Sequence, residues 1–178
     1  MRAVVALDGS ELDHDIAAAA AFVLHAGRDR VSLLMVVSPG ELDETPVGTG
    51  GGSFVPTPQS TVSGVTLPST EILTPTAEGR DQAVARVRTE RSAYLNSIGA
   101  QHLGDLPYEA HVEIADDPAE AIVRFVAEQG IEGLAMGTRT GRGRLGSALF
   151  GSVSETVIRR TNVPVLVVKR GGAAGDAG

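Results

Sequence analysis

The sequence contains no cysteine and no tryptophan, and only 3% of its 178 residues are aromatic. The absence of cysteine excludes a disulfide framework, a thiolate metal site and a cysteine nucleophile. The shortage of aromatic side chains argues against a surface on which nucleic-acid bases stack. Long apolar runs are also missing near the start, since residues 4–7 are too few for a signal peptide or a membrane span. We therefore expect a cytoplasmic protein with no nucleic-acid or membrane partner.

Lysine is nearly absent, and acidic residues outnumber basic ones. The single lysine is Lys169, the formal net charge is -7 and the isoelectric point is about 5.0. The ordinary P-loop, Gly-x4-Gly-Lys-Ser/Thr, is therefore excluded, and the acidic balance disfavours a general nucleic-acid surface. Basic residues nevertheless cluster in one place, since Arg139, Arg142 and Arg144 lie within one glycine-rich stretch. This cluster favours a small anionic ligand over a polyanion, although solvated arginines are the simpler alternative.

Apolar runs typical of buried strands recur along the chain, and stretches with helical spacing separate them. Strands are predicted at 4–7, 31–37, 108–114, 134–137 and 163–168, and helices at about 10–26, 77–98, from 117 onward and at 153–161. This order predicts one α/β domain over residues 1–170. Its expected core is an open, parallel, five-stranded sheet with helices on both faces.

Two of the predicted helices begin with capping signals. Ser10 is predicted to cap the first helix, with Asp13 as its acidic partner in the first turn. Asp117 is predicted to cap the helix that follows the third strand, and Pro118 suits the first turn of that helix.

Two segments fall outside this pattern. Residues 38–76 are rich in proline, glycine, threonine and serine, and an insert of this length is usually functional or disordered. Its residues 54–55 and 65–67 have the composition of a short hairpin, and a lid or a partner contact are both compatible with its position. The Gly/Ala-rich residues 171–178 are predicted to form a disordered tail.

The stretch from residue 134 to residue 168 has the order strand, glycine-rich loop, helix, strand. The loop ends at Gly151 and Ser152, where Ser152 as N-cap and Glu155 as its capping-box partner predict a helix start. Such a helix N-terminus offers unpaired N–H groups and a positive dipole end to a phosphate, and glycines let the backbone approach a ligand closely. A flexible surface turn is the alternative explanation of these glycines.

Asp8 stands where the first strand ends. In open parallel sheets, ligands bind beyond the carboxyl ends of the strands, where the strand order reverses. If the first and fourth strands are neighbours, Asp8 and the loop after Gly137 lie at this point; otherwise Asp8 only terminates its strand. Residues 141–146 also match the Gly-x-Gly-x-x-Gly pattern of dinucleotide-binding loops. Dinucleotide binding is disfavoured, because this pattern should follow the first strand rather than the fourth, and because Leu166 stands where an acidic residue is required. The four histidines lack metal-ligand spacing, and no catalytic machinery is evident.

Several motifs resemble those of the universal stress protein family. They are Val-Ala-Leu-Asp-Gly-Ser at 5–10, Asp-Asp-Pro-Ala-Glu-Ala-Ile at 116–122, Met-Gly-Thr-Arg at 136–139, Leu-Phe-Gly-Ser-Val-Ser-Glu at 149–155 and Thr-Asn-Val-Pro-Val-Leu-Val-Val at 161–168. They occur in the family's order and cover nearly the whole chain outside the insert and the tail. The resemblance implies the strand order 3-2-1-4-5.

In one branch of the family, the resemblance also implies ATP with Mg²⁺, bound through Gly-x2-Gly-x9-Gly-Ser/Thr. Gly141, Gly151 and Ser152 have this spacing, whereas Gly137 lies one residue too early, as if Thr140 had been inserted. Asp8 would then contact the ribose or the metal–phosphate group, and Val36 would offer backbone groups to adenine. The implied nucleotide-binding set is Asp8, Val36, Gly137, Thr138, Arg139, Gly141, Gly151, Ser152 and Val153.

The resemblance further implies a homodimer. The last strand, which begins at Val163 and ends at Val168, would form a sheet edge, and an uncovered apolar edge invites pairing with another chain. The alternative is that the chain's own tail, residues 171–178, covers this edge, but the tail is poor in apolar groups. Three functions remain open: an ATP-dependent regulatory or stress-response homodimer, an interaction module that has lost the nucleotide, and an enzyme that is at most a slow ATPase. An additional protein partner is compatible with the first two.

Overall fold

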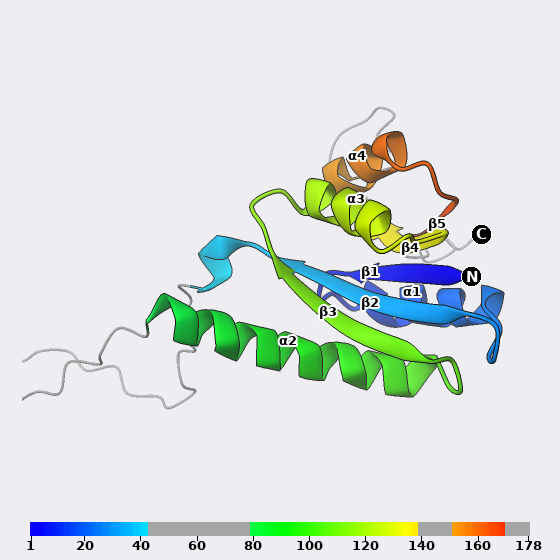
Figure 1. Ribbon diagram of the computed structural model, residues 1–178, viewed down its shortest axis with the longest axis horizontal. Helices are drawn as coiled ribbons and strands as arrows, with labels where there is room; N and C mark the ends of the chain where they lie inside the picture. Colours follow the sequence, from blue (N-terminus) through cyan, green and yellow to red (C-terminus); the bar gives the residue numbers. More distant parts are fainter. Residues whose placement is uncertain (43–78, 139–150, 170–178) are drawn as a thin grey trace, which may run out of the picture.

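The computed structural model describes residues 1–42, 79–138 and 151–169 of the chain. Within these ranges, parallel strands form one open sheet in the order β3-β2-β1-β4-β5 (Figure 1). The strands are β1 (Arg2–Leu7), β2 (Arg30–Val37), β3 (Tyr108–Ile114), β4 (Gly133–Thr138) and β5 (Val165–Lys169). The predicted α/β class, the parallel sheet and its strand order are therefore confirmed.

Helices cover both faces of this sheet. The helices are α1 (Leu12–Val23), the short 3-10 helix η1 (Pro39–Leu42), α2 (Arg80–His102), α3 (Pro118–Glu128) and α4 (Ser152–Arg160). Figure 1 shows α1 and α2 on one face of the sheet and α3 and α4 on the other. Among the helices in the described ranges, none is long and apolar enough to cross a membrane.

The core consists of two apolar layers separated by the sheet. Val5 and Leu33 pack toward α1 and α2, whereas their neighbours Val4 and Leu34 pack toward α3 and α4. All four side chains are almost completely buried. Because strands that are covered on both faces bury every side chain, these segments appear in the sequence as continuous apolar runs.

β1 lies in the middle of the sheet, with β2 on one side and β4 on the other. Its Ala6 lies opposite Met136 of β4. The chain leaves β1 toward α1 on one face, whereas α4, which follows β4, packs on the opposite face. The adjacency that the sequence left open is thus present, and the carboxyl ends of β1 and β4 form the crevice at which the strand order reverses.

Of the capping predictions for α1 and α3, the one for α3 is confirmed and the one for α1 is wrong. Asp117 Oδ1 accepts hydrogen bonds from the N–H groups of Ala119 (2.9 Å) and Glu120 (3.1 Å). In contrast, α1 has Glu11 at its N-cap and no side-chain cap, so the predicted role of Ser10 is absent. The segment before α1 is held by backbone and by a buried carboxylate instead, as described below.

Several boundaries differ from the sequence prediction. α1 ends at Val23 rather than near residue 26, because Leu24 already has an extended backbone. α2 continues to His102, four residues beyond its predicted end, and η1 occupies the start of the predicted insert. The predicted hairpin, residues 43–78 of the insert and the tail from 171 to 178 lie outside the described residues.

Candidate functional site

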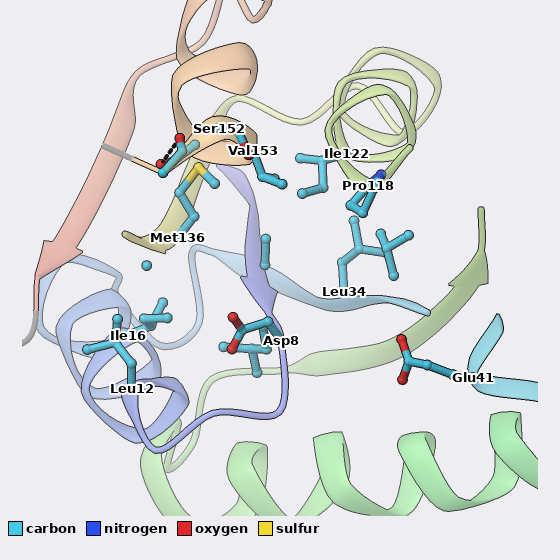
Figure 2. Close-up of a pocket in the computed structure, with 16 residues that line it drawn as sticks. Asp8, Leu12, Ile16, Leu34, Glu41, Pro118, Ile122, Met136, Ser152 and Val153 are labelled. Atoms are coloured by element: carbon cyan, nitrogen blue, oxygen red, sulfur yellow. Dashed lines mark hydrogen bonds between the residues drawn. The ribbon is translucent and has the colours of Figure 1, made fainter. Parts of the chain in front are cut away.

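A pocket of about 470 Å³ opens at the crevice between the carboxyl ends of β1 and β4 (Figure 2). Its described lining consists of Ala6, Leu7, Asp8, Leu12, Ile16, Leu34, Val36, Glu41, Pro118, Ile122, Met136, Gly137, Gly151, Ser152, Val153 and Ser154. This volume is within the range of small-molecule sites. The pocket thus lies where an open α/β sheet is expected to bind its ligand.

The two sides of the pocket differ in chemistry. Figure 2 shows Ser152, at the start of α4, on one side, and Asp8 and Glu41 further across the opening. Leu34 and Ile122 lie beside Pro118 on the right of the view and supply apolar surface. The first-turn N–H groups of an α-helix have no intrahelical acceptor and carry the positive end of the dipole. The pocket therefore combines a donor-rich end at the start of α4, apolar surface, and a carboxylate end that Asp8 and Glu41 form.

The start of α4 differs from the predicted capping box. Gly151, not Ser152, is the N-cap residue, and no side chain caps the helix. Glu155 instead forms an ion pair with Arg159 (2.9 Å). Because the extended backbone of Gly151 already completes the turn into the helix, Ser152 becomes its first residue and lines the pocket.

Thr138, at the end of β4, holds this helix start in place. Its Oγ1 accepts a hydrogen bond from the Gly151 N–H (3.2 Å), and Ser154 Oγ lies 3.5 Å away. Ser154 Oγ also donates to the Gly151 carbonyl (2.9 Å). Thr138 is only 2% exposed. Its hydroxyl therefore joins β4 to α4 from beneath the pocket and occupies one of the N–H donors of the helix start.

Gly137 lies in close contact with side chains of α1. A Cβ atom at this position would lie 2.7 Å from Leu12 Cδ2 and 2.9 Å from Ile16 Cδ1. Real Cβ atoms do not approach other atoms so closely, so the ends of these two side chains would have to shift if position 137 carried a side chain. Gly137 also lines the pocket, but this close approach of α1 explains the glycine without a ligand.

Asp8 is carried by a tight turn that a buried carboxylate supports. Gly9 has a positive φ of 82°, which favours glycine. Asp13 Oδ1 accepts from the Asp8 N–H (3.1 Å), and Asp13 Oδ2 accepts from the Gly9 N–H (2.8 Å) and from the Tyr94 hydroxyl (2.9 Å). Asp13 is fully buried, and this burial raises the pKa of its carboxyl above the ordinary value despite the three donors.

Glu41 is a second pocket residue that the sequence interpretation missed. Its Oε1 accepts from the Ser38 N–H (3.1 Å), and its Oε2 lies 3.3 Å from Arg91 Nη2 on α2. The residue belongs to η1, at the start of the stretch predicted as an irregular insert. The signal that was available is weaker than for Asp8, because Glu41 comes four residues after the end of a predicted strand, whereas Asp8 follows its strand directly.

The structure brings most of the implied nucleotide-binding set together. Asp8, Val36, Gly137, Gly151, Ser152 and Val153 line the one pocket, and Thr138 lies beneath the start of α4. Arg139 and Gly141 are outside the described residues. Across the described part of the chain, no three His, Asp or Glu side chains are grouped so as to hold a metal ion.

Comparison with known proteins identifies the family of this chain. A model of the universal stress protein family matches residues 1–169. The stress response protein NhaX of Bacillus subtilis is 30% identical over an alignment that covers 94% of this chain and 97% of the relative. Universal stress protein MJ0577 of Methanocaldococcus jannaschii is 45% identical over 53 residues, 30% of this chain and 32% of the relative.

Solved structures support the same fold. The structure of MJ0577 has a TM-score of 0.65 and 21% identity, with 97% of each chain covered. A universal stress protein from Archaeoglobus fulgidus in complex with dAMP has a TM-score of 0.54 and 20% identity, covering 94% of this chain and 96% of that one. At these identities, the two structures establish the fold of this chain, and the nucleotide is a finding about the Archaeoglobus protein.

Proposed function

The chain belongs to the universal stress protein family, and we propose that it is a cytoplasmic, nucleotide-dependent regulatory or stress-response homodimer that binds ATP with Mg²⁺. The observation that carries this proposal is the polarity of the pocket at the carboxyl ends of β1 and β4, with helix donors on one side and carboxylates on the other. A nucleotide presents the complementary order of groups: phosphates, then an uncharged ring system with hydroxyl and amine donors.

The phosphates fit the α4 side of the pocket. Because Thr138 Oγ1 occupies the Gly151 N–H, the first-turn N–H groups of Ser152 and Val153 are the helix donors that we assign to phosphate oxygens. Arg139 and Gly141 follow β4 in the chain and would complete the phosphate contacts. A flat base fits between Leu34 and Ile122, with the backbone of Val36 at its edge.

The carboxylates fit the other half of the ligand. Asp8 and Glu41 accept hydrogen bonds, so they suit the ribose hydroxyls and the exocyclic amine of adenine. Asp8 follows β1, the neighbour of β4, and Figure 2 shows it between Ser152 and Glu41, so of the two carboxylates we assign Asp8 the contact to Mg²⁺, directly or through water. Magnesium in such sites is held by few carboxylates together with phosphate oxygens and water, so a cluster of three protein ligands is not needed.

The dimer is proposed to form at β5. This strand is the last in the sheet order, and Val165 to Val168 are only half-buried in the single chain. Such an apolar edge is suited to pairing with a second copy.

An interaction module without nucleotide is the second candidate. Thr138 favours it, because its hydroxyl removes one of the N–H donors on which a phosphate site at this helix would draw. In this case the pocket would stay empty in the cell, and the dimer would act through its surface. Slow hydrolysis of bound ATP is compatible with the first candidate, and we assign no residues a catalytic role in it.

The test begins with protein purified without added nucleotide. Released small molecules are identified by mass spectrometry after denaturation, and Mg-ATP binding is measured by calorimetry. We expect ATP or ADP near one per chain, or calorimetric binding by the emptied protein. Asp8→Asn and Gly151→Val, which alter the carboxylate end and the donor end, should each weaken binding by at least about tenfold, which corresponds to 1.4 kcal/mol.

The matched control is Asp105→Asn. This exposed aspartate precedes β3 and lies in another surface depression, with Gly27 and Pro107, so its replacement should leave binding unchanged. Absence of nucleotide together with absence of Mg-ATP binding in the wild type would overturn the proposal in favour of the interaction module.

A further inference from the structure

Asp13 is the fully buried carboxylate of the described chain, and it is absent from the pocket lining. Burying a carboxylate is unfavourable unless hydrogen bonds satisfy it. Its three donors are the N–H groups of Asp8 and Gly9 and the hydroxyl of Tyr94. Two of these donors belong to the turn that carries Asp8. The buried carboxylate of Asp13 therefore helps to hold a pocket residue in position.

We propose that the carboxylate end of the pocket is positioned from α2, with Tyr94 acting through Asp13 on Asp8 and Arg91 acting on Glu41. None of the described lining residues comes from α2, so the helix would influence the ligand only through these contacts. The inference deepens the proposed function, because it concerns the carboxylates to which we assign the nucleotide and Mg²⁺.

The first connection is the stronger one. Asp13 binds the backbone on both sides of the Asp8 carbonyl, at 3.1 Å and 2.8 Å, and Asp8 Oδ1 in turn accepts from the Ser10 N–H (3.1 Å). Gly9 has a positive φ, which turns the chain between β1 and α1, and both N–H groups of this turn bond to Asp13. A change at Asp13 therefore frees the turn and displaces Asp8, and displacements of about 1 Å are enough to weaken a preorganised site.

Tyr94 extends this connection to α2. Its hydroxyl donates to the same Oδ2 that holds Gly9 (2.9 Å and 2.8 Å). Arg91, nearly one helical turn earlier, lies 3.3 Å from Glu41 and 3.8 Å from the position of a Cβ on Gly9. One side of α2 therefore contacts Glu41 directly and, through Tyr94, the residue that supports Asp8.

The experiment compares Tyr94→Phe with Tyr108→Phe, which are the two tyrosines of the chain. Tyr108 donates its hydroxyl to the Asn96 carbonyl (3.2 Å), away from the pocket, so its substitution is the matched control. Tyr94→Phe should weaken Mg-ATP binding by about threefold to tenfold, the equivalent of one lost hydrogen bond, and Asp13→Asn by more. Tyr108→Phe should leave the affinity unchanged.

A second readout needs no nucleotide. Residue-resolved amide exchange of the free protein should show faster exchange at Asp8 and Gly9 in both Tyr94→Phe and Asp13→Asn, with Val5 of β1 unchanged. A loss of overall stability would accelerate Val5 as well, so this comparison separates positioning from unfolding. If Asp13→Asn does not fold, Tyr94→Phe still gives the result.

These measurements distinguish failure of the positioning inference from failure of the proposed nucleotide binding. If the wild type binds no Mg-ATP but the Asp8 and Gly9 amides respond as expected, the positioning holds and the nucleotide proposal fails. If the wild type binds Mg-ATP and Tyr94→Phe changes neither affinity nor amide exchange, the inference is overturned.

Discussion

Thr138 Oγ1 accepts a hydrogen bond of 3.2 Å from the N–H of Gly151, thirteen positions later in the sequence. Thr138 itself is almost completely buried. The bond fixes where α4 begins relative to the end of β4, and both ends border the pocket. In the family motif implied by the sequence, the first glycine would fall at position 138. The structure shows that the threonine there has a structural role, which explains how the helix start is held although the glycine lies one residue early.

We expect Thr138→Val to lower the free energy of unfolding by about 0.5–1.5 kcal/mol, because the part-buried N–H of Gly151 loses its acceptor while the side-chain volume is kept. Urea denaturation measures this change. Thr138→Ser is the control, since it retains Oγ and should cost less. A Val variant as stable as the wild type would contradict the role assigned to the hydroxyl.

Gly137→Ala tests the close approach of α1 to β4. The added Cβ would lie 2.7 Å from Leu12 Cδ2, and overpacking of this kind costs about 1–3 kcal/mol. The substitution should become less harmful when Leu12→Ala removes the Leu12 atoms, although Ile16 Cδ1 still lies 2.9 Å from the added Cβ. A double-mutant cycle by denaturation gives the coupling between the two positions, and strictly additive effects would show that the contact is not the reason for the glycine.

The fold could be predicted from the sequence because its signals are local. Covered strands appear as apolar runs, and Asp117 followed by Pro118 marks a helix start within a few residues. The capping box at Ser152 had an equally local signal but was wrong, because the extended backbone of Gly151 already supplied the cap. Short-range patterns therefore locate elements well and their first residues less well.

The supports of the site could not be predicted in the same way. Asp13 and Tyr94 are 81 positions apart, and nothing in the spacing around either residue indicates that α1 and α2 bring them together. Near the helix start, Asp13 resembles an ordinary first-turn acid. Its burial depends on the turn at Gly9 and on the packing of α2, both of which are tertiary features.

Tyr94 should titrate later than an ordinary tyrosine. Burial and then the hydrogen bond to Asp13 raise its pKa to about 12. Since the folded pKa lies above the unfolded value near 10, the resulting stabilisation is present in full below pH 10 and is lost as pH rises through about 12. Tyrosinate absorbance of the wild type should show this late step, and Tyr94→Phe should remove it. Its persistence in that variant would exclude Tyr94 as the source.

Stability should also depend on pH through His102. Its Nε2 lies 2.8 Å from His14 Nδ1, between α2 and α1. Burial and then the neighbouring His14 lower the pKa of His102 below its ordinary value of 6.5. A depressed pKa gives stability that is present above pH 6.5 and lost as pH falls through the lower folded value. Thermal melts from pH 7.5 to 5 should show this loss, and His102→Gln should flatten it; an equally steep decline in the variant would place the effect elsewhere.

Val167→Lys tests the proposed pairing of two chains at β5. Val167 lies opposite Met136 in the outermost strand pair and is half-buried in the single chain. A lysine on an edge strand opposes pairing, because it would place two ammonium groups within one shared interface. Light scattering at micromolar concentration should therefore give a dimer for the wild type and a monomer for the variant.

Phe22→Lys is the matched control for this experiment. Phe22 is a 90% exposed apolar residue on α1, so the variant should remain dimeric. A wild-type monomer would remove β5 pairing, and a dimer that persists in Val167→Lys but is lost in Phe22→Lys would move the interface to α1.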